Sequence, residues 1–170
     1  ELKAEGGVIS GEQFVDECQV ESDLELLLPA TYVTGSSERM LLYRELDSLT
    51  LDKDVEDFRT RLIDRFGPIP SETEELLRIV PLRRLAARLG AEKVFLKGGR
   101  MSLFFVSNPD SPYYQSQAFG KVIAYMMKYT RRCDLREQNT RRSMLVKDVK
   151  NVETAVSVLQ EIVAMQVEEG

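Results

Sequence analysis

The most regular hydrophobic pattern in the chain lies between residues 51 and 66. Its apolar side chains are spaced four, three, four and four residues apart, as on one face of an α-helix: Leu51, Val55, Phe58, Leu62 and Phe66. Gly67 can adopt the left-handed backbone that ends many helices, and Pro68 cannot continue one. The pattern therefore predicts an amphipathic helix that stops at the sequence GPIP.

Two further helices are predicted on either side of this one. Residues 34–37 have the composition of a loop, and their serines can cap a helix that runs from Glu38 to about Ser48. The sequence SETE at residues 71–74 has the form of a capping box, and the helix after it should run to Leu89. Pro81 lies inside that helix, so we expect a kink or a split there.

The second half of the chain changes to hairpins that are each followed by a helix. Gly98-Gly99 lies between two runs of β-forming residues and is a strong hairpin signal. The predicted elements are, in order, strands at 93–97 and 100–106, a helix at 113–129, strands at 133–136 and 143–147, and a helix at 151–165. In the helix at 113–129, we expect Met126 and Met127 to face inward. The predicted fold class is α+β, with a helical N-terminal part packed beside a small antiparallel sheet made of two hairpin–helix units.

The chain is long enough for one domain with a core and short for two. Residues 1–23 are acidic, contain glycine and show no clear period, so we expect a poorly ordered linker followed by a single domain at 24–170. Residues 25–28, just before Pro29, are expected to be a short strand or an extended segment. The absence of an initial Met leads us to expect a piece of a larger protein.

The composition argues against most enzyme classes. No histidine occurs, which removes the common catalytic triads and zinc-ligand sets, and no phosphate-binding loop of the form GxxxxGK[ST] is present. The two cysteines, Cys18 and Cys133, lie far apart, as in a reducing cytoplasmic compartment. No run of about 18 apolar residues suggests a membrane span. We therefore expect a cytoplasmic, non-catalytic domain with no metal and no cofactor.

Charge is distributed unevenly along the chain. Residues 1–60 carry 5 basic and 15 acidic side chains, a balance of −10, whereas residues 121–150 carry 9 and 3, a balance of +6. The basic stretch contains five arginines that form a candidate patch for a nucleic acid or an acidic protein: Arg131, Arg132, Arg136, Arg141 and Arg142. Arg141 and Arg142 fall at a predicted turn, where both side chains can reach outward together. The alternative is that these side chains are solvated and offset the acidic N-terminal residues, since a net charge of −5 disfavours phosphate-driven binding.

The last turn of the helix at 51–66 carries an unusual charge. Asp64 lies there, where an exposed acidic residue opposes the helix macrodipole at a cost of roughly 0.3–1 kcal/mol. At ~100° per residue, Asp57, Arg61, Asp64 and Arg65 share one flank of this helix. Arg61 can pair with Asp57 and with Asp64, which is enough to account for a solvated face. The alternative is that Arg61, Asp64 and Arg65 contact another protein surface.

Four motifs, in this order, resemble a known family. They are LLLP at 26–29, Arg39 with Leu42 and Tyr43, LIDRFGPIP at 62–70 and LLRIVPLRRLAARLG at 76–90. Together they resemble the C-terminal domain of the bacterial transcription-repair coupling factors, the Mfd family, from about residue 24 to 165. The most specific part is LIDRFG, followed by proline and then by an LRxxAxxLG helix.

The resemblance implies a regulatory role. In this family the C-terminal domain folds back onto a UvrB-like module of the same polypeptide and covers the surface that recruits UvrA, until RNA polymerase is engaged. Contacts with DNA and RNA polymerase, and the ATPase motifs, belong to other domains. Asp64 and Arg65 occupy positions that match the family's interdomain contact, whereas Arg61 stands where the family often has an acidic residue. The resemblance therefore implies an autoinhibitory domain, and a nucleic-acid-binding module that uses the basic stretch at 128–150 is the alternative.

Overall fold

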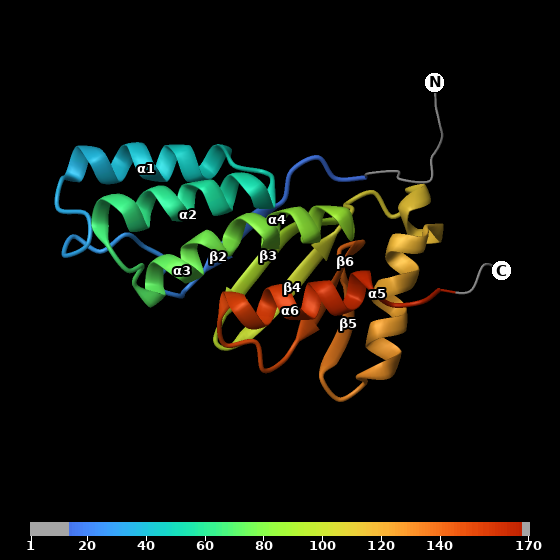
Figure 1. The fold of residues 1–170 in the computed structure, drawn as a ribbon. Helices are drawn as coiled ribbons and strands as arrows, with labels where there is room; N and C mark the ends of the chain where they lie inside the picture. Colours follow the sequence, from blue (N-terminus) through green and yellow to red (C-terminus); the bar gives the residue numbers. More distant parts are fainter. Residues whose placement is uncertain (1–13, 168–170) are drawn as a thin grey trace, which may run out of the picture.

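The computed structural model describes residues 14–167 of the chain. A helical part lies beside a sheet that carries further helices (Figure 1). The helices of the first part are α1 (Ser36–Ser48), α2 (Asp52–Phe66) and α3 (Ser71–Leu77), and α4 (Ile79–Arg88) continues from α3 onto the sheet. The sheet part contains β2 (Gln19–Ser22), β3 (Ala91–Lys97), β4 (Arg100–Phe105), the 3₁₀ helix η1 (Pro112–Gln115), α5 (Gln117–Lys128), β5 (Cys133–Gln138), β6 (Arg141–Val146) and α6 (Val152–Val163). The predicted α+β class is confirmed.

The described strands form a five-stranded sheet in the order β2-β3-β4-β6-β5. Both predicted hairpins, β3–β4 and β5–β6, are present and antiparallel. Gly98 and Gly99 have φ values of 63° and 73°, the left-handed backbone that a two-residue hairpin turn requires. The second hairpin achieves the same turn with Asn139 and Thr140, at φ 53° and 63°.

The edge strand β2 differs from the sequence-based prediction. Residues 1–13 of the predicted linker lie outside the described residues, but within residues 14–23 β2 pairs in parallel with β3, which makes the sheet mixed. Residues 25–28, predicted to be a strand or an extended segment, have no strand pairing. The local sequence QVES contains one apolar residue, Val20, and therefore carries almost no strand signal of its own. This segment is therefore a strand because its backbone pairs with that of β3.

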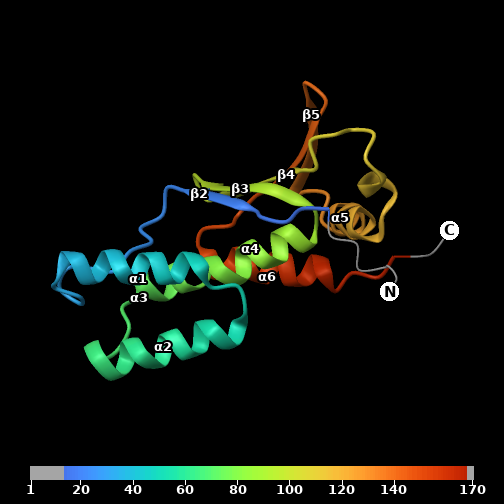
Figure 2. The ribbon, with the colours of Figure 1, turned by 90° about the horizontal axis from the view of Figure 1, so that it is seen from above.

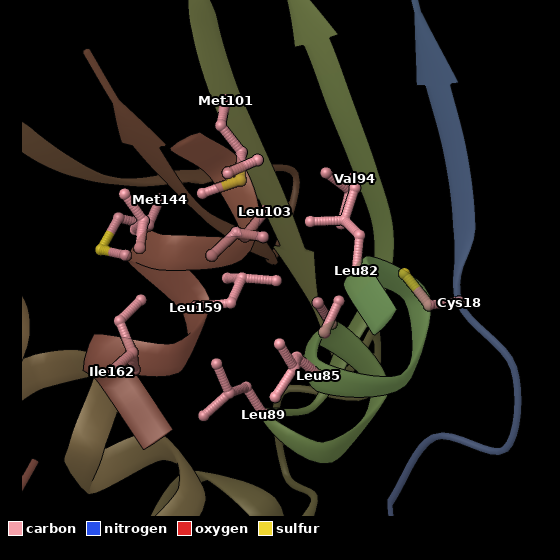
Figure 3. Close-up of a cluster of buried hydrophobic side chains, with 14 of the residues drawn as sticks. Cys18, Leu82, Leu85, Leu89, Val94, Met101, Leu103, Met144, Leu159 and Ile162 are labelled. Carbon is pink, nitrogen blue, oxygen red and sulfur yellow. The ribbon is translucent and has the colours of Figure 1, made fainter. Parts of the chain in front are cut away.

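The helices α4, α5 and α6 lie on one face of the sheet, as the view from above shows (Figure 2). In Figure 3, leucines of α4 and α6 point toward the side chains of β3, β4 and β6. The labelled core residues are Cys18, Leu82, Leu85, Leu89, Val94, Met101, Leu103, Met144, Leu159 and Ile162, each at most 7% exposed. A second cluster, built around Phe58 and Leu62, fills the space between α1, α2 and α3.

The helix predicted to run from residue 71 to 89 is split, as Pro81 led us to expect. The break falls at Arg78, between α3 and α4, because Pro81 lacks an N–H and its ring clashes with the carbonyl of Leu77, four residues earlier. The predicted capping by serine is wrong at both sites. The N-cap of α3 is Pro70 and that of α1 is Gly35, and neither helix has a side-chain cap.

The helix predicted at 113–129 begins later than expected. Residues 112–115 form η1, and α5 starts at Gln117, where Ser116 accepts a hydrogen bond from the N–H of Phe119 at 3.3 Å. Met127 is 67% exposed, so the prediction that both methionines face inward is wrong for this one. Adjacent helical residues lie about 100° apart, and only Met126 packs against the core.

Glu75 of α3 binds the N-terminus of α6, although the two segments are far apart in the sequence. Its carboxylate accepts hydrogen bonds from the N–H groups of Val152 at 2.6 Å and Glu153 at 3.0 Å. We expect Glu75→Ala to lower the free energy of unfolding by about 2 kcal/mol, because two helix N–H groups lose their acceptor. Urea unfolding measures this, with Asp47→Ala on the exposed side of α1 as the control, expected within about 0.5 kcal/mol of wild type. Equal losses in both variants would contradict the capping role.

Candidate functional site

Arg61 and Arg65 of α2 form ion pairs with the neighbouring helix α1. The guanidinium of Arg61 donates to the Glu45 carboxylate, with Nη1 and Oε1 at 3.2 Å, and Arg65 pairs with Glu38. The predicted pairing of Arg61 with Asp57 and Asp64 is therefore replaced by a contact between helices. The cause is tertiary, because α1 lies beside the flank of α2 that carries these arginines.

Asp64 stays exposed in the last turn of α2 and forms no hydrogen bond or ion pair with any residue of the described range. Leu41 of α1 is 63% exposed. It lies three residues after Glu38 and four residues before Glu45, so all three share one stripe of the helix. We use the name α1–α2 surface for this set of residues: Glu38, Leu41, Glu45, Arg61, Asp64 and Arg65.

A shallow hollow of about 180 Å³ lies in the α1–α2 surface. Its walls are the two arginines and apolar side chains of both helices: Leu42, Phe58, Leu62 and Phe66. The guanidinium carbon of Arg65 lies 4.8 Å from the centre of the Phe66 ring, and that of Arg61 lies 5.4 Å from the Phe58 ring. An apolar floor with a charged rim is the usual composition of a protein–protein contact.

The ion pairs of this surface are exposed and therefore weak. The side chains of Arg61 and Arg65 are 54% and 58% exposed, and pairs of this kind contribute about 0–1 kcal/mol to stability. The hydrogen bond to Glu45 raises the pKa of Arg61, so its charge is constant over the ordinary pH range. Carboxylates of another surface can compete for these arginines at little cost to the fold.

The five arginines of the predicted basic patch do not form one surface. Arg132 donates to the carbonyl oxygens of Lys147 at 2.9 Å and Asp148 at 3.3 Å, which ties the start of β5 to the end of β6. Arg131 is exposed at the turn between α5 and β5. Arg131 and Arg132 thus precede β5, whereas the other three arginines lie within β5 and β6.

Arg141 and Arg142 do not reach outward together, because they are successive residues of β6 and lie on opposite faces of the sheet. Arg142 stands on the helix-covered side, with its guanidinium carbon 4.3 Å from the Tyr114 ring centre. Arg136 and Arg141 lie on the opposite face and line one hollow there.

Three basic residues of the first hairpin join that face, and sequence reasoning missed them. They are Lys93, Lys97 and Arg100, each out of phase with the buried Val94, Leu96 and Met101. Period-two alternation was the available signal, since it places these positions on the face opposite the core. The grouping with Arg136 and Arg141 could not be seen, because it depends on the pairing of β4 with β6.

The acidic and cysteine side chains are the remaining groups that could supply a chemical site. Between residues 14 and 167 no group of three or more acidic or cysteine side chains is arranged to hold a metal ion, and no helix there is long and apolar enough to cross a membrane. Both cysteines are free and buried. Burial raises the pKa of the Cys18 thiol to about 12, so it remains protonated and a poor nucleophile.

Comparison with known proteins gives a consistent result. The model of the TRCF domain family matches residues 22–116, more than half of the chain. The transcription-repair-coupling factor of Rickettsia bellii is 30% identical over 132 residues, which cover 77% of this chain and 11% of that protein. That of Escherichia coli is 32% identical over 78 residues, 46% of this chain and 7% of that protein.

A solved structure agrees on the fold. The crystal structure of the C-terminal domain of a transcription-repair coupling factor matches with a TM-score of 0.65 at 17% identity, and the match covers 86% of this chain and 93% of that one. The chain spans only 11–12% of the length of the first Rickettsia relatives. The family match over residues 22–116 and the shared fold lead to one conclusion. This chain belongs to the TRCF domain family of transcription-repair coupling factors.

Proposed function

We propose that this chain is a non-catalytic, autoinhibitory domain whose α1–α2 surface docks onto a UvrB-like module of the same polypeptide. Docking covers the surface of that module that recruits UvrA, until RNA polymerase is engaged. The observation that carries the proposal is Asp64, an exposed carboxylate with no partner among the described residues, next in sequence to Arg65, which lines an apolar hollow with Arg61. The macrodipole disfavours a carboxylate at the end of α2, and a cation of the docking partner would offset that cost.

Weak contacts suit this role. A tether within one polypeptide gives the docking site a high effective concentration, so the contact needs little affinity of its own and can still be released. Arg65 can move from Glu38 to a carboxylate of the partner because the existing pair is exposed. DNA and RNA polymerase would be contacted by other parts of the longer cytoplasmic protein.

The test is UvrA binding to the full-length parent protein. We expect Asp64→Ala/Arg65→Ala to bind UvrA as tightly as a parent from which this domain has been deleted, and both to bind more tightly than wild type. The matched control is Asp47→Ala/Lys53→Ala, which removes one acidic and one basic exposed side chain where α1 leads into α2, at the end of the helix pair far from Asp64. It should bind UvrA like wild type.

The other outcomes separate the parts of the proposal. If only the deletion gains UvrA binding, the domain masks the site through a different surface. If neither the deletion nor the double variant gains binding, masking does not occur in this protein, and the regulatory proposal is wrong.

A further inference from the structure

One face of the sheet carries no helix among the described residues (Figure 2). Core side chains such as Val94, Leu103 and Met144 point toward α4 and α6, so the alternate residues of each strand point the other way. We call this the open face. Its residues on the three central strands are Lys93, Phe95, Lys97, Arg100, Ser102, Phe104, Arg141, Ser143 and Leu145.

The centre of the open face is an aromatic pair on adjacent strands. The rings of Phe95 and Phe104 meet edge to face, with centroids 5.4 Å apart. Both phenylalanine side chains are partly buried, and neither belongs to a core cluster. The Nζ atoms of Lys93 and Lys97 lie 4.9 Å and 5.0 Å from the centre of the Phe95 ring. Lysine side chains are flexible, so they can leave the ring when a flat group stacks on it.

Basic residues outnumber acidic ones on this face, in a chain whose net charge is −5. Lys93 pairs with Glu21 at 2.8 Å and Arg141 with Glu92 at 3.2 Å, while Arg136 of β5 is 3.9 Å from Asp134. Lys97 and Arg100 form no ion pair with any residue between 14 and 167. These two cations stand at the β3–β4 turn, next to the aromatic pair.

Two hollows of about 310 and 380 Å³ cover the open face, and both are lined by Ser102, Arg136 and Leu145. They therefore lie next to each other, one toward the β3–β4 turn and the other toward the β5–β6 turn. The first hollow is also lined by Gln138 and Asn139, whose amides can both donate and accept hydrogen bonds.

We propose that the open face binds single-stranded nucleic acid. Bases stack on Phe95 and Phe104, and Lys97, Arg100 and Arg136 contact the phosphates. An aromatic platform beside a cationic track is how sheets hold single strands with little sequence preference. A protein partner fits less well, because the core of a protein interface is depleted of charge, whereas this face has a single aliphatic side chain, Leu145, among the three central strands.

The test is fluorescence anisotropy of the 170-residue chain with a labelled oligothymidine of about 12 nucleotides, in about 50 mM and about 200 mM salt. We expect binding that weakens steeply with salt. Lys97→Gln/Arg100→Gln should lower the affinity about tenfold. Arg44→Gln/Lys53→Gln removes the same charge from the exposed surface of α1 and α2, and should change the affinity less than twofold.

The aromatic contribution is tested separately with Phe104→Leu, which keeps an apolar side chain and should lower the affinity about tenfold. Thermal unfolding of each variant shows whether it is folded. No salt-dependent binding, or equal losses in both charge variants, would overturn the proposal. If a polyglutamate peptide binds as tightly and Phe104→Leu has no effect on either ligand, the open face is a general anion-binding surface for acidic protein segments instead.

Discussion

Replacing Gly90 by alanine should destabilise the domain by about 2–5 kcal/mol, one of the two largest effects that we expect from a single substitution. Gly90 joins α4 to β3 with φ at 86°, a conformation that costs other residues about 1–2 kcal/mol. A methyl group there would lie well inside van der Waals distance of three atoms of the Tyr113 ring. Overpacking of this kind costs about 1–3 kcal/mol more.

Tyr113 cannot move aside easily, which is why the expected loss is large. It is fully buried, and its hydroxyl donates to the carbonyl oxygen of Leu89 at 2.5 Å. Gly67 provides the matched control, because its φ is 89° and a methyl group would meet nothing within 4 Å. With ψ at −163°, Gly67 has a backbone that is essentially restricted to glycine, so Gly67→Ala should lose only the backbone part, about 1–3 kcal/mol. Urea unfolding of both variants gives the difference, and equal losses would show that Tyr113 does not constrain this position.

Replacing Phe58 by alanine should lower the free energy of unfolding by about 3–5 kcal/mol, because the side chain is 1% exposed and its removal leaves a cavity. Leu51 belongs to the same apolar stripe of the sequence but is 58% exposed. Leu51→Ala should therefore stay within about 0.5 kcal/mol of wild type. Comparable losses in the two variants would mean that Leu51 is buried in solution.

The Phe58 variant also tests how the two hydrophobic clusters cooperate. Phe58 packs with residues of α1, α2 and α3, whereas the larger cluster lies between the sheet, α4, α5 and α6. We expect the amide hydrogens of α1 and α2 to exchange faster in Phe58→Ala, while those of β3 and β4 keep more of their protection. Uniform loss of protection would show that both clusters unfold as one unit.

Local sequence signals were sufficient where neighbours along the chain make the structure. The α2 stripe, the stop at Gly67 and the Gly98-Gly99 hairpin each depend on nearby residues. The stop and the hairpin are confirmed, and so is the stripe except for Leu51, which precedes α2 and is exposed. Signals of equal strength misled where a tertiary contact competes with them. Ser71 is a good cap by sequence, yet α3 has Pro70 at its N-cap, and the hydroxyl of Thr73 donates to the carbonyl of Leu27 at 2.8 Å.

In the candidate site too, local sequence patterns place some residues and tertiary packing decides their partners. Helical periodicity alone places Asp64 and Arg65 on one flank of α2. Which residues they pair with depends on the helix that packs beside α2. That helix is α1, whose glutamates pair with Arg61 and Arg65, while Asp64 stays exposed without a partner among the described residues. The basic stretch at 128–150 looked continuous because arginines close in sequence were counted together. Strand alternation separates Arg141 from Arg142, and pairing of β4 with β6 brings Arg100 and Arg136 to one face instead.

By itself, the sequence determined the helical and hairpin elements of this protein, its family resemblance and the absence of histidine chemistry, because these depend on composition and on residues near one another in the chain. The tertiary structure alone decided that β2 joins the sheet, that Leu51 is exposed while Phe58 is buried, and that one face of the sheet carries cations around two aromatic rings. Each of these features depends on contacts between distant segments, whose closeness is set by the packing of the whole domain.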